Sequence, residues 1–391
     1  MPVLRIGTRQ HGFTIIELLV ALVIGLIGSL AIMQIYVGSE AGKRATGSLA
    51  EAQGGGMVAL YAIERELQQA GLGFMHLAAL GCRLQSDTSV IKLDNVPLQP
   101  VTIIPAGATQ TDSANLWGIP PGDANSDMIA IAAGDASAMV EGTITTIAAA
   151  SGATTYRLSS VLGLANGDWL LLSEAGKDCT LTRVESTNID GDVTVTYGGV
   201  SDYAANSRVL HLGRAPTLVV YAVRNGTLTR CDFLASDCTD AGQVNNTTVW
   251  VPVANDVVAI AAQYGFDTSA TADMTVENYC KSRVPPGGQC PATDDGMAAP
   301  GMLSATQPAR ACDWARVPIV QLALVSRSGQ YEKEEVSPAS IKLWPDNTND
   351  AVPPTTRGPV WNVPDRHYRY RVARTAVALR NVIWMGAQST C

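Results

Sequence analysis

The chain has little charge, few aromatic side chains and very few histidines. Of its 391 residues, 16% are charged, 6% are aromatic and four are histidine. The formal net charge is -8 and the sequence pI is about 5.1, with no long run of lysine or arginine. A nucleic-acid-binding domain needs a basic patch or stripe, so we expect no RNA or DNA partner.

The sequence also lacks the common catalytic motifs. It has no His-Glu-x-x-His, no Gly-x-Ser-x-Gly and no phosphate-binding Gly-x-x-x-x-Gly-Lys-Ser/Thr. Asp190-Gly-Asp192 and Asp294-Asp295-Gly296 lack the full acidic spacing of a calcium loop, which favours ordinary Asp-Gly turns. The scattered histidines are interpreted as packed or surface residues, apart from the first, which lies in the N-terminal leader: His11, His76, His211 and His367. We therefore predict a protein that is not an enzyme, with no cofactor and no metal.

One long apolar run lies near the N-terminus. Residues 12–37 contain a single charge, Glu17, and exceed the length of about 20 apolar residues that crosses a bilayer. A carboxylate costs roughly 2.5–3.5 kcal/mol at the bilayer centre, so a plain membrane anchor leaves Glu17 unexplained. A secretory signal peptide would have its cleavage site after a shorter apolar core, whereas Gly12-Phe13 precedes this run. Arg5 and Arg9 place the short side in the cytoplasm and the body across the membrane.

The cysteines predict disulfides. All eight follow residue 80, in the part expected to face an oxidising compartment. Two close pairs are the first candidates, Cys231 with Cys238 and Cys280 with Cys290, and the partners of the remaining four stay open: Cys82, Cys179, Cys312 and Cys391. Zinc is the alternative, but the spacings match no finger or ribbon and no histidine is near.

The helical period continues beyond the apolar run. Apolar residues three and four apart predict a stripe that packs on a globular head: Met57, Leu60, Ile63, Leu67 and Ala70. Gly54-Gly55-Gly56 predicts a kink or a melted turn, since each glycine costs a helix about 1 kcal/mol. Gly71 or Gly73 is expected to end the helix.

The remainder is predicted to form strands between turn residues. Residues 265–315 are predicted to form a long disulfide-stapled loop, and residues 344–366 an irregular stretch. The predicted strands are Met128–Ala133, Thr143–Ile147, Trp169–Ser173, Thr180–Glu185, Val193–Tyr197, Thr217–Val223, Thr248–Val253, Val257–Tyr264, Pro318–Ser326 and Tyr368–Leu379.

The N-terminal pattern resembles the class III signal of type IV pilins and type II secretion pseudopilins. A basic leader precedes Gly12-Phe13, and Glu17 would be the fifth residue after cleavage. The resemblance implies that prepilin peptidase cuts between Gly12 and Phe13 and methylates the Phe13 amine. It also implies that Glu17 meets the Phe13 amine of a neighbouring subunit and sets the register of assembly. The spacing of Thr14 and Glu17 fits a capping box at the new helix start.

Three later segments resemble the minor pilin family PilW, which is related to the J-type pseudopilins. They are Tyr61–Gly73, then Val257–Asp267 with Val317–Ser328, and Tyr370–Asn381, which contains Leu-Arg-Asn. Leu72 stands where the family has an aromatic residue. Residues 85–250 and 268–315 have no counterpart in this resemblance.

The resemblance implies an α+β pilin-like fold with a long N-terminal helix on a β-rich, disulfide-stapled head. The expected parts are a leader at 1–12, a transmembrane helix at 13–37, an amphipathic helix at 38–73 and a head at 74–391 with one or two subdomains. A protein of this kind sits in the bacterial inner membrane with its head in the periplasm and then at a pilus tip. Its expected partners are other minor pilins, the major pilin, prepilin peptidase and a large tip adhesin.

Two other functions stay open. One is a J-type pseudopilin at the tip of a type II secretion pseudopilus, since both fibres use the same helix. The other is a membrane-anchored periplasmic binding domain, which the position of Glu17 disfavours.

Overall fold

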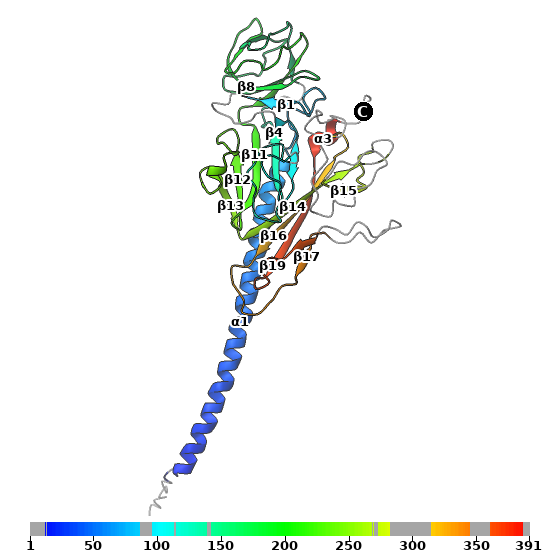
Figure 1. Ribbon diagram of the computed structural model, residues 1–391. Helices are drawn as coiled ribbons and strands as arrows, with labels where there is room; N and C mark the ends of the chain where they lie inside the picture. Colours follow the sequence, from blue (N-terminus) through cyan, green and yellow to red (C-terminus); the bar gives the residue numbers. More distant parts are fainter. Residues whose placement is uncertain are drawn as a thin grey trace, which may run out of the picture. The chain divides into compact units, whose positions relative to one another are not determined.

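The computed structural model describes residues 12, 14–86, 96–112, 115–138, 142–267, 269, 273–281, 314–344 and 360–385. Its contacts divide the chain into two compact units, Met1–Ala50 and Glu51–Cys391. A single helix, α1 (Ile15–Leu67), contains described residues of both units (Figure 1). The second unit is the β-rich head, and the arrangement is α+β and pilin-like, as predicted.

The helix continues through the glycine triplet, so the predicted kink or melted turn is wrong. A Cβ atom built on Gly56 would lie 2.9 Å from the Ser326 Oγ and 3.3 Å from the Ser326 Cβ. Glycine here allows the helix backbone to approach the sheet closely, and packing against the sheet compensates for its low helix propensity. The helix also ends at Leu67, before Gly71 and Gly73, because the chain tightens into turns with Ala70 N–H donating to Leu67 O.

The head contains three main sheets. The eight-stranded sheet contains β1 (Arg83–Gln85), β2 (Val96–Pro97), β5 (Thr143–Ile144), β6 (Thr155–Arg157), β7 (Trp169–Ser173), β8 (Cys179–Thr187), β9 (Asp192–Val195) and β10 (Arg208–Gly213). The five-stranded sheet has the order β13 (Val251–Asn255), β12 (Thr227–Asp232), β11 (Thr217–Arg224), β4 (Met128–Ala133) and β3 (Val101–Ile104).

The four-stranded sheet has the order β15 (Asn278–Cys280), β14 (Val257–Phe266), β16 (Ile319–Arg327) and β19 (Tyr370–Ala378). A separate pair is formed by β17 (Ser340–Lys342) and β18 (Val360–Asn362), and two short helices complete the described part: η1 (Ala241–Gln243) and α3 (Arg380–Met385). Each of the ten predicted strands overlaps an observed strand. The sequence prediction missed the other nine described strands, of which β10 and β12, with six residues each, are the longest.

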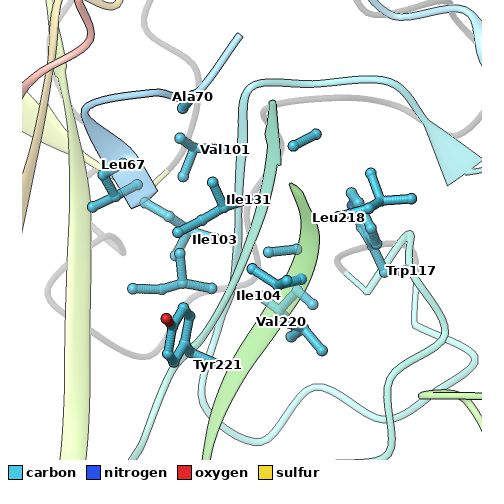
Figure 2. Close-up of a cluster of buried hydrophobic side chains, with 14 of the residues drawn as sticks. Leu67, Ala70, Val101, Ile103, Ile104, Trp117, Ile131, Leu218, Val220 and Tyr221 are labelled. Atoms are coloured by element: carbon cyan, nitrogen blue, oxygen red, sulfur yellow. The ribbon is translucent and has the colours of Figure 1, made fainter. Parts of the chain in front are cut away.

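The main core lies where the end of α1 meets the five-stranded sheet. Leu60, Ile63 and Leu67 are buried, as the stripe predicted. Figure 2 shows Leu67 and Ala70 directed towards side chains of β3 and β4. Met57 departs from the prediction because it is 54% exposed. The helix turns Gly56 towards the sheet at that level, so the neighbouring Met57 side chain points away.

Two disulfides join described cysteines. Cys231 bonds Cys238, one of the two close pairs expected from the sequence, and Cys82 bonds Cys179 across 97 residues. Cys280 is also disulfide-bonded, while Cys290, Cys312 and Cys391 lie outside the described residues. No cysteine in the described part of the chain is free.

Candidate assembly site on the long helix

The first turn of α1 is capped by Thr14. The Thr14 Oγ1 accepts the Glu17 N–H at 3.3 Å, and the Thr14 carbonyl accepts the Leu18 N–H at 3.1 Å. Glu17 is exposed in this turn, where a carboxylate is favoured by the positive end of the helix dipole. Phe13 and residues 1–11 lie outside the described residues. The predicted capping spacing at Thr14 thus corresponds to a hydrogen bond.

The rest of this unit is a helix covered with exposed apolar side chains. Ile15–Arg44 is long and apolar enough to span a membrane, and none of it is buried within the structure. Every large apolar residue from Ile15 to Val37 is more than half exposed. Exposure of so much apolar surface to water is unfavourable, so this segment needs lipid or other helices around it.

The second half of the helix is held against the head by close packing. Gly55 lies near the Asn255 carbonyl, and Gly56 lies against Ser326 of β16 and Ala373 of β19. Gly54, by contrast, faces open space. Among the three glycines, only Gly56 is in a position where a side chain would collide with its neighbours.

An ion pair joins the helix to β12. The Arg230 Nε donates to the Glu66 Oε1 at 3.1 Å, and both side chains are less than one-third exposed. Burial, together with the negative Glu66 carboxylate, raises the pKa of the Tyr221 hydroxyl on the adjacent strand. The Glu66 carboxylate thus lies in a partly buried place, where the Arg230 guanidinium supplies the opposite charge.

The end of the helix is capped from the far end of the chain. The Asn381 Nδ2 donates to the Gln69 carbonyl at 3.1 Å and to the Ala70 carbonyl at 3.0 Å. These carbonyls lie just beyond the last helical residue, and the Gln69 carbonyl also accepts the Leu72 N–H at 3.0 Å. Leu379, two residues earlier, is fully buried in the main core. The Leu-Arg-Asn ending thus contributes one core side chain and one helix cap.

The outer face of the same helix segment remains apolar and uncovered. Met57, Val58 and Tyr61 are 54%, 63% and 69% exposed. They continue, within the second unit, the exposed apolar character of the membrane segment. This segment of the helix therefore has one face packed on the head and one exposed apolar face.

The candidate metal ligands have other roles in the described residues. Oxygens of Asp267, Asp273 and Glu277 lie within 4.8 Å of one another. However, the Asp267 carboxylate accepts the backbone N–H groups of Ser269, Asp273 and Met274, at 2.7 to 3.0 Å. We interpret this carboxylate as a centre that organises its loop.

Asp190-Gly-Asp192, one of the two acidic motifs from the sequence, lies in a turn. Asp192 accepts the Arg157 Nε at 2.8 Å and the Asn188 Nδ2 at 3.0 Å, which fits a turn. Asp294-Asp295-Gly296 lies outside the described residues.

The histidines occupy unrelated environments. The His211 ring lies 3.0 Å from the Asp168 carboxylate, and both side chains are buried. His367 stacks on Tyr331 with ring centroids 4.9 Å apart. Burial, followed by the nearby Arg208 charge, lowers the pKa of His76. His11 lies outside the described residues. The sequence did not indicate the Asp168–His211 pair, since its members are 43 residues apart.

Two family models match the chain at the places where the helix and its contacts lie. Residues 7–33 match the prokaryotic N-terminal methylation motif, and residues 220–381 match PilW, the type IV pilus-assembly protein W. The chain is therefore similar to PilW over residues 220–381. No curated protein matches it.

The PilW match begins in β11 and ends at Asn381. It includes Arg230, Ser326 and Asn381, which contact the helix or cap its end. Residues 220–250, for which the sequence resemblance suggested no counterpart, lie inside the match. The segment Tyr61–Gly73 lies outside both matched ranges. The chain thus combines a methylation motif at its N-terminus with a match to a pilus-assembly protein over its later strands.

Proposed function

We propose that this chain is a minor pilin that helps to prime a type IV pilus and is incorporated at its tip. The observation that carries the proposal is the combination, in one chain, of a methylation motif, an exposed apolar helix and a PilW match over the strands that hold that helix. Prepilin peptidase cleaves between Gly12 and Phe13 and methylates the Phe13 amine. The helix begins in the inner membrane, with the head in the periplasm.

Glu17 sets the register of assembly in this proposal. A lone carboxylate among apolar side chains is costly unless it is paired. The terminal amine of a neighbouring mature subunit supplies the opposite charge. Thr14 bonds the Glu17 backbone N–H, and the Glu17 carboxylate makes no hydrogen bond or ion pair with the described residues, so it is available to that amine.

The partners follow from the same helix. Other minor pilins and the major pilin pack against its apolar surface, including Met57, Val58 and Tyr61. A large tip adhesin would sit on the head, and the assembled subunit reaches the cell surface. In this proposal the central region of the head, residues 85–250, takes no part in the packing of helices between subunits.

Mass spectrometry of fibres sheared from the cell surface tests this proposal. A methylated peptide beginning at Phe13, in small amounts beside major pilin, is the expected result. A processed protein found only in the envelope, with loss of protein export on deletion, would instead indicate a J-type pseudopilin. An uncleaved form beginning at Met1 would overturn the pilin assignment of Gly12 and Glu17.

Glu17→Ala tests the register role separately. Fibre incorporation should fall at least about tenfold, because an unmade charge pair in an apolar place costs several kcal/mol. Glu51→Ala is the matched control, since Glu51 is an exposed acid on the same helix. Equal incorporation of Glu17→Ala and Glu51→Ala would contradict the role of Glu17.

A further inference from the structure

The outer edge of β19 carries unpaired backbone groups. β19 pairs with β16 through nine consecutive residues, and no register shift interrupts the pairing. At its two ends, Leu379 N–H donates to the Pro318 carbonyl and Ser328 N–H donates to the Arg369 carbonyl. In an antiparallel pair the bonded residues alternate, so the odd-numbered residues of β19 face β16.

The even-numbered residues therefore direct their N–H and C=O groups away from the sheet. These residues are Tyr370, Val372, Arg374, Ala376 and Ala378. None of their backbone groups has a backbone partner among the described residues. Figure 1 shows β19 beside β16, leading into α3. A row of unpaired groups on a regular strand is a template for another strand.

The other sheet edges in the described part of the chain are blunted. The edge strand β13 has five residues, contains Pro252, and pairs with β12 through a shifted register. β2 has two residues and ends at Pro97, and β3 lies between Pro100 and Pro105. β19 is the longest of the edge strands described, and it contains no proline. Natural proteins protect edges with proline, shortness and bulges, and β19 has none of these.

The side chains beside this edge leave room and carry positive charge. Ala376 and Ala378 are exposed and small, so a partner strand can approach the backbone. Arg371, Arg374 and Arg380 are exposed, and no described carboxylate forms an ion pair with them. The Arg374 Nη2 donates to the Lys342 carbonyl, which holds that guanidinium in place beside the strand.

We propose that the β19 edge binds an extended acidic segment of a different protein as a fifth strand of this sheet. Backbone hydrogen bonds to the even-numbered residues supply the pairing, and Asp or Glu side chains of the partner meet the three arginines. A second copy of this chain is a poor occupant, because it would bring the same arginines to the same edge. Trp384, 81% exposed in the helix after β19, offers an aromatic anchor beyond the strand's end.

Residue-resolved amide exchange on the full-length chain in detergent micelles tests this proposal. The probe is a ten-residue peptide that alternates threonine and valine with glutamate, and the matched peptide has lysine in place of glutamate. With the acidic peptide, the amides of the even-numbered residues should exchange at least about tenfold more slowly, as expected for amides that gain hydrogen bonds. The odd-numbered amides are already bonded to β16 and should not change.

Ala376→Pro removes one outward N–H and no bond to β16, so it should abolish the protection while the melting temperature stays unchanged. Ala376→Ser is the matched control and should keep the protection. Absence of protection, equal protection by the lysine peptide, or protection that survives Ala376→Pro would each overturn the proposal. The measurement needs no fibre, so its failure is distinct from failure of the proposed pilus role.

Discussion

Two parts of the head differ in how they are tied to α1. The family-matched part, residues 220–381, supplies an ion pair through Arg230, close packing through Ser326 and a helix cap through Asn381. The eight-stranded sheet, which we term the lobe, makes no hydrogen bond or ion pair with the helix among the described residues. The lobe has a core of its own, with Tyr156 and Val193 among its buried residues.

This difference means that the strands that hold the helix and the lobe are under different constraints. The part that matches PilW holds the helix that is proposed to enter the fibre, so a change there alters the geometry of assembly. The lobe approaches the segment that follows the helix, where a Cβ atom built on Gly73 would lie 3.2 Å from the His211 carbonyl. Its sequence can therefore vary without disturbing the helix contacts.

The largest expected effect comes from the disulfide that ties the lobe to the segment after the helix. Replacing Cys82 and Cys179 together with alanine opens a crosslink between residues 97 apart. Chain-entropy arguments give a loss of about 4–5 kcal/mol in the free energy of unfolding. Replacing Cys231 and Cys238, which are seven residues apart, should cost about 2 kcal/mol. Urea unfolding of the full-length protein in micelles measures both.

Limited proteolysis shows where the first variant opens. We expect cleavage to begin in the lobe, while peptides containing Arg230 and Asn381 stay protected. Simultaneous cleavage of both parts would mean that the lobe and residues 220–381 unfold as one unit, which would contradict their separation.

Gly56→Leu should have the next largest effect, and it acts on the matched part. A leucine side chain would collide with Ser326 and Ala373, and overpacking of this kind costs about 3 kcal/mol. Gly54→Leu is the matched control, because nothing lies within 4 Å of the Cβ built at Gly54. Gly54→Leu should raise the melting temperature slightly, since leucine favours the helix by somewhat under 1 kcal/mol. Equal melting temperatures for the two variants would show that the close approach at Gly56 has no importance.

The same glycines show how far the sequence could predict this fold. The helix, its apolar stripe and ten strands follow from local periodicity, which is readable in a single sequence. The behaviour of Gly56 depends on Ser326, which is 270 positions away, so propensity alone predicted a break. Met57 was misplaced for the same reason, because the neighbouring glycine occupies the position facing the sheet.

The contacts of the candidate site were predictable only in part. Thr14 and Glu17 are close in sequence, and their spacing predicted the cap that the structure contains. The pairs Glu66–Arg230 and Asn381–Gln69 join residues more than 160 positions apart, so no local pattern could indicate them. The resemblance to PilW indicated the Leu-Arg-Asn ending, while the structure supplies the physical role of its asparagine.

Asn381→Ala should have a smaller effect on the matched part. It removes two hydrogen bonds to carbonyls at the end of the helix, which is worth about 1–2 kcal/mol. Arg380→Ala is the control, since Arg380 is the exposed neighbour. We expect a lower midpoint of urea unfolding for Asn381→Ala only. A shift of the same size in both variants would contradict a capping role for Asn381.

The smallest expected effect lies in the lobe, at the exposed pair of Arg157 and Asp192. Hydrogen bonds from the side chains of Arg157 and then Asn188 together lower the pKa of Asp192 to about 2. Because the folded pKa lies below the ordinary value of 3.8, this contact stabilises the fold above pH 4 and loses its effect as the pH falls through about 2. Arg157→Gln should raise the pKa of Asp192 towards 3.8, as measured by NMR titration of its carboxyl group.

The pair is solvent-exposed, so the variant should unfold like the parent near neutral pH. It should also enter fibres normally, because Arg157 and Asp192 join β6 to β9 within the lobe. Reduced incorporation of Arg157→Gln, with Asp192 titrating near its ordinary value, would show that a change confined to the lobe reaches the helix. The lobe would then share in holding the helix, together with the strands of the other two sheets that contact it.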